Sequence, residues 1–195
     1  MAILKANTSS WSAATSVQRG TLWKRLAVIL ACTATLKAGP PEQVDEYQVK
    51  AAFVYNFAKF VEWPPAAFKS AQDPIVICVL GENSFRNSLE EAIKGKVVDG
   101  RTFVVRPVSQ NQLPCPCHML FVNASERKSF RSMVGDLKGG VLTIGETPGF
   151  DFEGGIINFK LVSGRIRFEI NVKAAEQEKL HLSSKLLSLA EIIQK

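Results

Sequence analysis

Enzyme motifs are scarce in this chain of 195 residues. Its two histidines, His118 and His181, have no aspartate or serine beside them in a nucleophile-elbow setting. The run GENSF, which follows a predicted strand, lacks the second glycine and the Lys-Ser/Thr pair of a phosphate-binding loop, and it is not GxGxxG. The acidic pairs at 45–46 and 90–91 occupy adjacent helical positions, so their side chains point to different sides. These absences argue against a hydrolase or a transferase, and we predict a protein that is not an enzyme and needs no cofactor.

Excess positive charge is missing once the first 38 residues are set aside. The whole chain carries 24 Lys and Arg against 18 Asp and Glu, a net charge of +6. Residues 1–38 hold five of the basic residues and no acidic residue, so residues 39–195 carry 19 against 18. A net charge of +1 does not provide the excess of basic residues that binds the phosphates of a nucleic acid. We therefore predict no nucleic-acid partner.

Long apolar runs are also missing, apart from one short stretch near the N-terminus. The segment TLWKRLAVILACTATLKAG has a basic pair, an apolar run of eleven residues and then small residues. This order is typical of a secretory signal peptide, and the run is shorter than the roughly twenty residues that span a bilayer. We expect residues 1–38 to be a signal peptide cleaved near Ala38, and residues 39–195 to be a single exported, periplasmic domain. An uncleaved anchor, a buried helix and a lipoprotein acylated at Cys32 are the alternatives.

The exported part alternates strand patterns with helix patterns. Continuous apolar runs indicate buried strands, and apolar residues at three- and four-residue spacing indicate amphipathic helices. The predicted strands are 74–81, 101–108, 118–122 and 140–145, and the predicted helices are 42–63, 84–94 (capped by Ser84) and 126–138 (capped by Ser125). This alternation predicts an α/β fold with a largely parallel sheet that helices cover on both faces.

The pattern changes in the last third of the chain. Two alternating segments, 155–162 and 165–171, are separated only by Ser163 and Gly164, which predicts an antiparallel hairpin. We expect a short helix over 172–179 and a final amphipathic helix over 180–195, capped by Ser183 or Ser184.

Cysteine is rare, yet CPCHM places two of the four cysteines beside a histidine and a methionine. CxCH is one residue short of a haem attachment motif, and CxxC opening a helix, as a thioredoxin-type site needs, is absent here. A bridge between Cys115 and Cys117 would be strained. A copper(I) site of Cys115, Cys117, His118 and Met119 is one alternative, although strand alternation sends His118 to the opposite face.

A disulfide is the interpretation of this segment that we favour. In an oxidising compartment cysteines pair by default, and the leader removes Cys32 from the count. Cys78 lies in the strand 74–81 and Cys117 opens the next strand but one, so a bridge between them would close a loop of about forty residues and stabilise the fold by a few kcal/mol. Cys115 is then the odd thiol. A periplasmic copper-binding protein stays as the alternative function.

Six segments together carry a resemblance to a known family. They are VKAAFVYNFAKFVEWP, VICVLGENSF, CHMLFV, VLTIGETPGF, GGIINFKLVSGRIRFEIN and LHLSSKLLSLA, in this order. They cover most of the exported part, and the chain resembles the YfiR-like family of exported bacterial proteins. The resemblance implies a three-layer α/β/α sandwich and a disulfide between Cys78 and Cys117. A second disulfide known in the family, after the TIGE strand, has no cysteines here.

The resemblance also implies a function. It is that of a periplasmic repressor that binds the sensory domain of an inner-membrane diguanylate cyclase, is sequestered by an outer-membrane lipoprotein and acts as a homodimer. A sensor kinase is the alternative membrane partner. The implied process is cyclic-di-GMP signalling, in which this protein would be a negative regulator working through protein–protein interaction.

Two segments are candidate binding surfaces. A tryptophan on a proline-stiffened turn is a good anchor for a partner or a small ligand, although it also suits the closing of a core. Serines at a helix start hold an anion or simply cap the helix. We hypothesise that one site comprises Glu62, Trp63, His181, Ser183, Ser184 and Lys185. The loop with Phe150 and Phe152 is the alternative contact surface.

Overall fold

The protein's structure, a computed structural model, describes residues 45–81, 83–112, 116–137 and 139–193. These residues fold as one compact unit. The predicted signal peptide, its cleavage point at Ala38, Cys32 and Cys115 lie outside the described residues. Within the described residues, no helix combines the length and the apolar character needed to cross a membrane.

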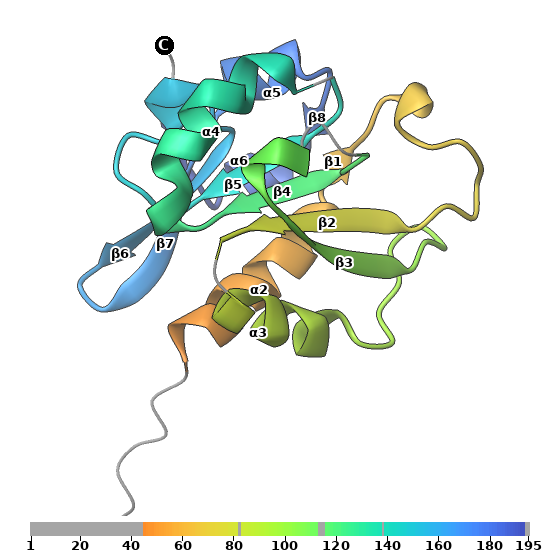
Figure 1. The fold of residues 1–195 in the computed structure, drawn as a ribbon, viewed down its shortest axis with the longest axis horizontal. Helices are drawn as coiled ribbons and strands as arrows, with labels where there is room; N and C mark the ends of the chain where they lie inside the picture. Colours follow the sequence, from red (N-terminus) through yellow and green to blue (C-terminus); the bar gives the residue numbers. More distant parts are fainter. Residues whose placement is uncertain (1–44, 82, 113–115, 138, 194–195) are drawn as a thin grey trace, which may run out of the picture. The chain divides into compact units, whose positions relative to one another are not determined.

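A seven-stranded sheet forms the centre of the unit, in the order β3-β2-β4-β5-β6-β7-β9 (Figure 1). The strands from β3 to β6 in this order are parallel, β7 returns antiparallel to β6, and β9 is parallel to β7. Their bounds are β2 Ile75–Leu80, β3 Phe103–Val108, β4 Met119–Val122, β5 Leu142–Gly145, β6 Ile157–Val162, β7 Arg165–Asn171 and β9 Glu191–Ile193. The predicted parallel sheet with a C-terminal antiparallel hairpin is confirmed.

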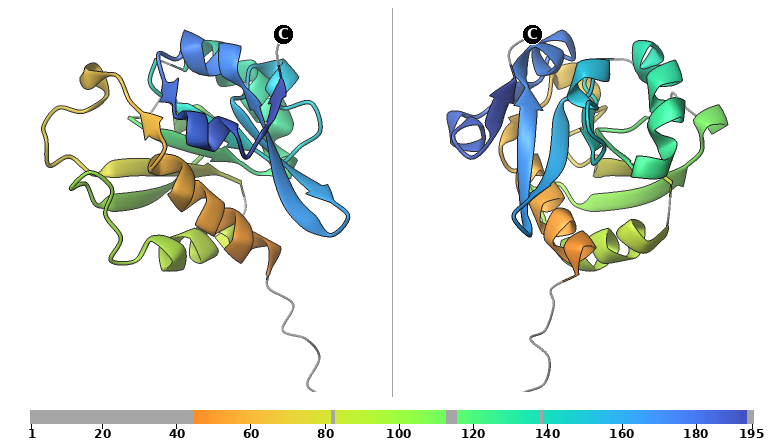
Figure 2. Two further views of the ribbon diagram at one scale, coloured as in Figure 1. Left: turned by 180° about the vertical axis from the view of Figure 1, so that it is seen from behind. Right: turned by 90° about the vertical axis from the view of Figure 1, so that its left-hand side faces the viewer.

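Helices cover both faces of this sheet (Figures 1 and 2). On one face lie α2 (Glu46–Ala58) and α3 (Asn83–Ile93), and on the other lie α4 (Arg127–Met133) and the short η6 (Asp151–Glu153). The predicted α/β/α sandwich is therefore confirmed. Because successive side chains of a strand point to opposite faces, β2 and β4 supply both layers of packing.

The two faces carry cores of different size. The larger core is built on Ile75, Ile77 and Val79 of β2 with residues of α2 and α3; its largest members include Phe57, Phe85, Phe121 and Phe159. The smaller core is built on Val76, Cys78 and Leu80 of β2; the rest of it is Cys117, Leu120, Val122, Phe130, Met133, Val141 and Phe150.

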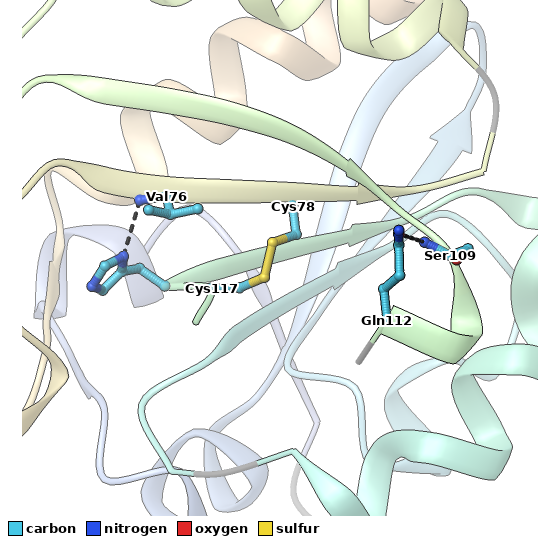
Figure 3. The surroundings of a disulfide bond; sticks show 6 residues. Val76, Cys78, Ser109, Gln112 and Cys117 are labelled. Atoms are coloured by element: carbon cyan, nitrogen blue, oxygen red, sulfur yellow. Dashed lines mark hydrogen bonds between the residues drawn. A yellow bond between two sulfur atoms is a disulfide. The ribbon is translucent and has the colours of Figure 1, made fainter. Parts of the chain in front are cut away.

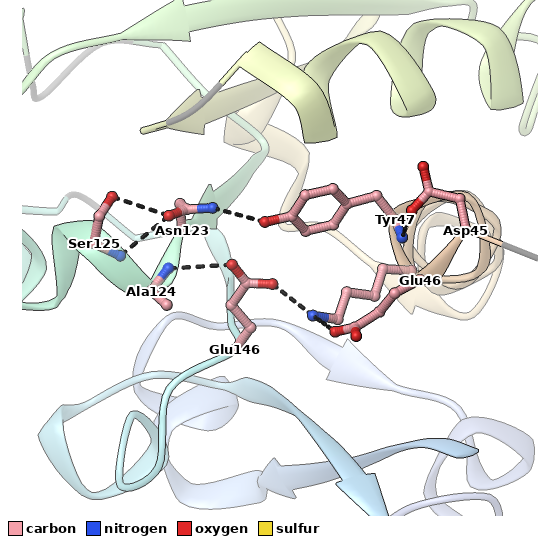
Figure 4. Close-up of polar contacts among 8 residues, drawn as sticks. Asp45, Glu46, Tyr47, Asn123, Ala124, Ser125 and Glu146 are labelled. Atoms are coloured by element: carbon pink, nitrogen blue, oxygen red, sulfur yellow. Dashed lines mark hydrogen bonds and ion pairs between the residues drawn. The ribbon is translucent and has the colours of Figure 1, made fainter. Parts of the chain in front are cut away.

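A polar clamp holds the start of α2 against the carboxyl ends of the central strands (Figure 4). Lys50 of α2 is 5% exposed, and its ammonium lies 2.6 Å from Glu146, which directly follows β5, and 2.5 Å from Glu46. Glu146 also accepts the backbone N–H of Ala124 (3.1 Å). The amide of Asn123 donates to the hydroxyl of Tyr47 at 3.2 Å. Tyr47 and Lys50 of α2 are thus hydrogen-bonded to the residues that directly follow β4 and β5.

Two tight turns explain why the chain changes direction where it does. Gly81 ends β2 with φ +114°, and a Cβ there would lie 2.5 Å from the Cβ of Asn123, so only glycine fits. Ser163 and Gly164 join β6 to β7 with φ values of 50° and 74°. Two consecutive positive values are those of the two-residue hairpin turn that the sequence predicts.

Several predicted helix ends were wrong. The helix expected over 42–63 is α2, which ends at Ala58, because Val61–Glu62 forms a short strand, β1. The final helix expected over 180–195 is instead β8 (His181–Leu182), α6 (Ser184–Leu187) and β9. In both places backbone pairing with a distant strand replaces helix hydrogen bonds.

Smaller differences concern the caps. Asn83 already belongs to α3, so Ser84 lies inside the helix rather than at its cap. The predicted helix 126–138 is split into η4 (Ala124–Glu126), α4 and η5 (Val134–Asp136), and the Asn123 side chain, not Ser125, provides the first cap. The short helix predicted over 172–179 is α5 (Val172–Gln177), capped by Asn171.

Candidate binding site

The strands β1 and β8 bring the two predicted halves of the site together. They pair antiparallel, with Glu62 opposite His181 and Val61 opposite Leu182. The N–H of Ser183 donates to the carbonyl of Phe60 at 2.9 Å. Segments more than a hundred residues apart are therefore neighbours, and Glu62 and His181 are direct partners in the register.

Trp63 follows β1 and is half-buried. Its indole N–H donates to the backbone carbonyl of His118 at 3.1 Å, and its ring lies edge-on to Phe68, 6.2 Å between centroids. Trp63 also packs against the larger core. The residue thus closes the core at one end while its exposed part faces a cavity.

A stack of three side chains forms the floor beside Trp63. The rings of Phe68 and His118 are nearly parallel at 4.2 Å, and the guanidinium of Arg101 lies 3.7 Å from the centroid of Phe68. Two groups this close to one ring must lie on its opposite faces. Arg101 is further held by the carbonyls of Ser70 (2.9 Å) and Asp73 (2.7 Å), so its position is fixed before any ligand arrives.

Hydrogen bonds fix the protonation state of His118. Its Nδ1 accepts the backbone N–H of Val76 at 2.9 Å, so Nε2 carries the proton and donates to the carbonyl of Ala67 at 3.0 Å. Burial lowers the pKa of His118, and the nearby Arg101 lowers it further. The imidazole is therefore neutral at neutral pH and serves as a structural bridge between β2, β4 and the loop before β2.

A carboxylate stabilises the same loop. Asp73 accepts the N–H of Lys69 (2.7 Å) and both the N–H and the hydroxyl of Ser70 (3.0 and 2.8 Å). These hydrogen bonds, that of the Ser70 hydroxyl foremost, lower the pKa of Asp73. The Asp73 carboxylate thus holds the two ends of the segment 69–73 together.

The cavity beside this stack has a volume of about 510 Å³. It has aromatic and charged walls; Glu62, Trp63, Phe68, Lys69, Asp99 and Arg101 line it. Planar groups stack on aromatic rings, and the mixed charges offer partners for either sign. The arrangement suits a small planar molecule or one large side chain of a partner protein.

The sequence did not single out Phe68 and Arg101. The available signal is the Asp-Gly pair at 99–100, which favours a two-residue turn. In the structure Val98 and Arg101 form the β-bridge that closes this turn, and both central residues have positive φ. The turn sets the start of β3 and brings Arg101 back over Phe68.

The remaining predicted residues, His181, Ser183, Ser184 and Lys185, are not among the residues that line the cavity. The hydroxyl of Ser183 accepts the N–H of Leu186 at 3.3 Å and thereby caps α6. The Lys185 ammonium lies 5.4 Å from the Phe60 ring centroid. Glu62 and Trp63 therefore contact the cavity directly, and His181 to Lys185 support the strand that carries them. Ligand binding by this set stays a prediction.

Figure 3 shows the disulfide that joins Cys78 of β2 to Cys117, just before β4. The two Cα atoms are 5.9 Å apart, within the usual range. The loop at the far end of β3 is closed by the Ser109 N–H, which donates to Gln112 (3.0 Å) in the same view. Each cysteine belongs to the smaller core.

The copper alternative is not supported by the described part of its ligand set. Cys117 is oxidised, both ring nitrogens of His118 are in hydrogen bonds, and Met119 is buried in the larger core. Cys115 lies outside the described residues. In the portion of the chain that the structure covers, no three His, Cys, Asp or Glu residues are placed to hold a metal ion.

The prediction of an alternative contact surface at Phe150 and Phe152 is wrong for Phe150. Phe150 is fully buried and stacks on Phe130 at 4.3 Å, because it fills the smaller core between Gly145, the last residue of β5, and Gly155. Phe152 is 58% exposed.

Comparison with solved structures gives two matches, of which one supports the fold. The chain is similar to a conserved domain protein from Vibrio cholerae O1 biovar El Tor, with a TM-score of 0.51 and 10% identity, over 76% of this chain and 60% of that one. This chain thus spans about 60% of that protein's length, and the likeness concerns the fold alone. The ABC domain in complex with L-Trp from Streptococcus pneumonia is 14% identical over 60% of this chain and 55% of that one; its TM-score of 0.43 is too low to carry an argument.

No curated protein matches the chain in sequence. A family model does match, described as YfiR/HmsC-like, over residues 47–191. This range runs from the first turn of α2 to the first residue of β9, so it takes in the strands β2 to β7 of the sheet, the disulfide and the residues around Trp63. The chain belongs to the YfiR/HmsC-like family.

Proposed function

We propose that this protein is an exported, non-enzymatic regulator that binds the periplasmic sensory domain of an inner-membrane diguanylate cyclase and holds that enzyme inactive. The observation that carries the proposal is the family match over residues 47–191. The cavity between Trp63, Phe68 and Arg101 adds a place where a side chain of the partner would be received.

The proposed mechanism is a shift of population in the partner. A binding protein inhibits an enzyme only to the extent that it binds the inactive form more tightly than the active form. Reversing a ratio of 1:99 to 99:1 takes a difference of about 10⁴-fold in affinity. An outer-membrane lipoprotein that binds the same surface would release the enzyme by competition, and a homodimer would bind both subunits of a dimeric cyclase.

The first experiment measures intracellular cyclic-di-GMP in a strain that lacks the gene, with and without a plasmid copy. We expect a rise on deletion that the plasmid reverses. An unchanged level would remove the diguanylate cyclase from the proposal. A sensor kinase would then be sought by pull-down from membranes.

The second experiment asks whether the proposed residues act as one site. Trp63→Ala removes an aromatic wall, and Lys185→Ala removes the ammonium above Phe60. Each variant is expected to bind the sensory domain at least about tenfold more weakly, a loss of about 1.4 kcal/mol. Glu176→Lys, on the exposed side of α5, is the matched control and is expected to bind normally. Normal binding by either alanine variant would contradict a single site made of these residues.

A further inference from the structure

The outer edge of β3 is unpaired in the described structure. β3 is the terminal strand of the seven-stranded sheet and pairs only with β2 (Figure 1). In a parallel ladder alternate residues bond to the neighbour, and the carbonyl of Thr102 accepts the N–H of Ile75 at 2.8 Å. Thr102, Val104 and Arg106 therefore face β2, and the backbone groups of Phe103, Val105 and Pro107 point away from the sheet.

The position of Pro107 agrees with this assignment. A proline has no N–H to give to a ladder and is accepted in a sheet only where its nitrogen faces outward. The edge thus offers two N–H groups, at Phe103 and Val105, and three carbonyls for a further strand. A segment of about five to seven residues would use all of them.

A groove runs along this edge. It has a volume of about 460 Å³ and lies between the end of α3, residues 94–97 and the strand itself. Val97 on its wall is 56% exposed, and Phe103, Val104 and Val105 are partly buried, whereas every residue of β2 is buried. Alternate side chains of an added strand would find apolar surface here.

Three exposed cations along the β3 edge favour an acidic occupant. Lys96 lines the groove, Lys59 lies over the ring of Tyr55, which packs against Phe103, and Arg106 is on β3, on the same face of the sheet as Cys78. None of the three has a carboxylate within ion-pair distance among the residues that the structure describes.

The nearby acids are mostly engaged. Glu90 is paired with Arg86 (3.6 Å) and Glu91 with Lys94 (3.9 Å), which leaves Asp99, at the turn before β3, as the one acid without an ion pair in the described surroundings of the groove.

From these observations we propose that the β3 edge is a docking site for an extended, acidic segment of a partner protein, which pairs with Phe103 and Val105 as an eighth strand. Backbone hydrogen bonds would supply affinity, and the lysines and arginine would select acidic side chains. This surface lies beside the Trp63 cavity but is a different one, and the proposal does not depend on the identity of the membrane enzyme.

The test uses a capped heptapeptide of alternating valine and glutamate, with a valine–lysine heptapeptide as its counterpart. Binding is measured by titration, and hydrogen exchange of the backbone amides is followed by NMR. We expect the acidic peptide to bind and to slow exchange at Phe103 and Val105 by at least about tenfold, while Val104 and Arg106, already bonded to β2, change little. The basic peptide is expected not to bind.

Charge reversals complete the test. Lys96→Glu with Arg106→Glu is expected to weaken binding of the acidic peptide at least about tenfold. Arg165→Glu with Arg167→Glu, a matched pair of exposed residues on β7 near the other end of the sheet, is expected to leave it unchanged.

Failure of the acidic peptide to bind, or binding without protection of Phe103 and Val105, would overturn the proposal. So would protection of these amides in the free protein that grows with protein concentration, because a second copy would then occupy the edge. None of these outcomes bears on the cyclic-di-GMP experiment.

Discussion

The two faces of the sheet are stabilised in different ways. The larger core, under α2 and α3, is rich in stacked aromatic rings such as Phe85 on Phe121 at 3.7 Å. The smaller core, under α4 and η6, contains fewer large side chains and is crossed by the Cys78–Cys117 disulfide. Burial of apolar surface stabilises the first face, and a covalent link supplements the second, where less surface can be buried. We expect the smaller face to depend on redox conditions and the larger face to be indifferent to them.

The largest expected effect comes from removing the disulfide. Cys78→Ala with Cys117→Ala opens a link between residues 39 apart, which costs about 4 kcal/mol by chain entropy. Urea unfolding measures the loss, and Cys115→Ser is the control that leaves the link in place. If the disulfide stabilises mainly the smaller core, hydrogen exchange of the backbone amides in the double variant accelerates more in α4 than in α3. Equal acceleration in both helices would mean that the two faces open together.

The second prediction concerns the polar clamp of Lys50, Glu146 and Glu46 at the start of α2. Burial lowers the pKa of Lys50, but the hydrogen bonds and charges of Glu146 and Glu46 outweigh it, so the pKa is raised and the ammonium stays charged. Lys50→Ala leaves Glu146 buried without its cation and is expected to cost about 3 kcal/mol. Glu46→Ala, whose side chain is 49% exposed, is the control and is expected to cost well under about 1 kcal/mol.

A double variant sharpens the second prediction. Lys50→Met with Glu146→Leu removes both charges and is expected to be more stable in urea than Lys50→Ala alone, since no uncompensated charge remains. A double variant less stable than the single one would show that the ion pair itself, rather than the orphaned carboxylate, determines the cost.

The third prediction concerns the junction between the faces at His118. His118→Ala removes the acceptor of the Val76 N–H and the donor to Ala67, and we expect a loss of about 2 kcal/mol. The loop over 64–73 is expected to become sensitive to limited proteolysis at conditions where both cores stay folded. His118→Gln, which keeps polar atoms at this position, is the milder control. Unchanged proteolysis in the alanine variant would show that Arg101 and Asp73 hold the loop unaided.

The smallest expected effect is the pH dependence of η6, where the pKa values of two acids move in opposite directions. Burial raises the pKa of Asp151, which is 1% exposed. The hydrogen bonds of Arg127 lower the pKa of Glu153.

The signs follow from proton linkage. Between the ordinary pKa of an aspartate and the raised value of Asp151, the folded state binds more protons, so the stability that Asp151 contributes is lost as pH rises through this window. Glu153 contributes stability above its ordinary pKa that is lost as pH falls through its lowered value. Each tenfold change in the acid dissociation constant of Asp151 on folding corresponds to about 1.4 kcal/mol.

Thermal melts from about pH 2 to pH 7 cover the pH windows of both acids and separate their effects. Asp151→Asn is expected to make the melting temperature fall less with rising pH than in the wild type, and Glu153→Gln to make it fall less with acidification. Parallel curves for the wild type and Asp151→Asn would contradict the raised pKa.

Elements whose pattern is local can be predicted from the amino-acid sequence alone. The buried runs of β2, β4 and β5, the hairpin turn at 163–164 and the short α5 follow from apolar runs, turn residues and caps within a few positions. These signals depend on the backbone conformation and burial of a short segment. They can therefore be recognised without knowing which distant residues the segment contacts.

Features that depend on pairing between distant segments could not be predicted in this way and became visible in the folded protein. Val61–Glu62 and His181–Leu182 became strands because each is the partner of the other, and Glu191–Ile193 became β9 because β7 had a free edge. The stack of Arg101, Phe68 and His118 and the burial of Lys50 against Glu146 likewise join residues that no local pattern relates. The physical reason is that short strands and buried ion pairs gain their stability from groups brought close by the fold, and not from their own neighbours in sequence.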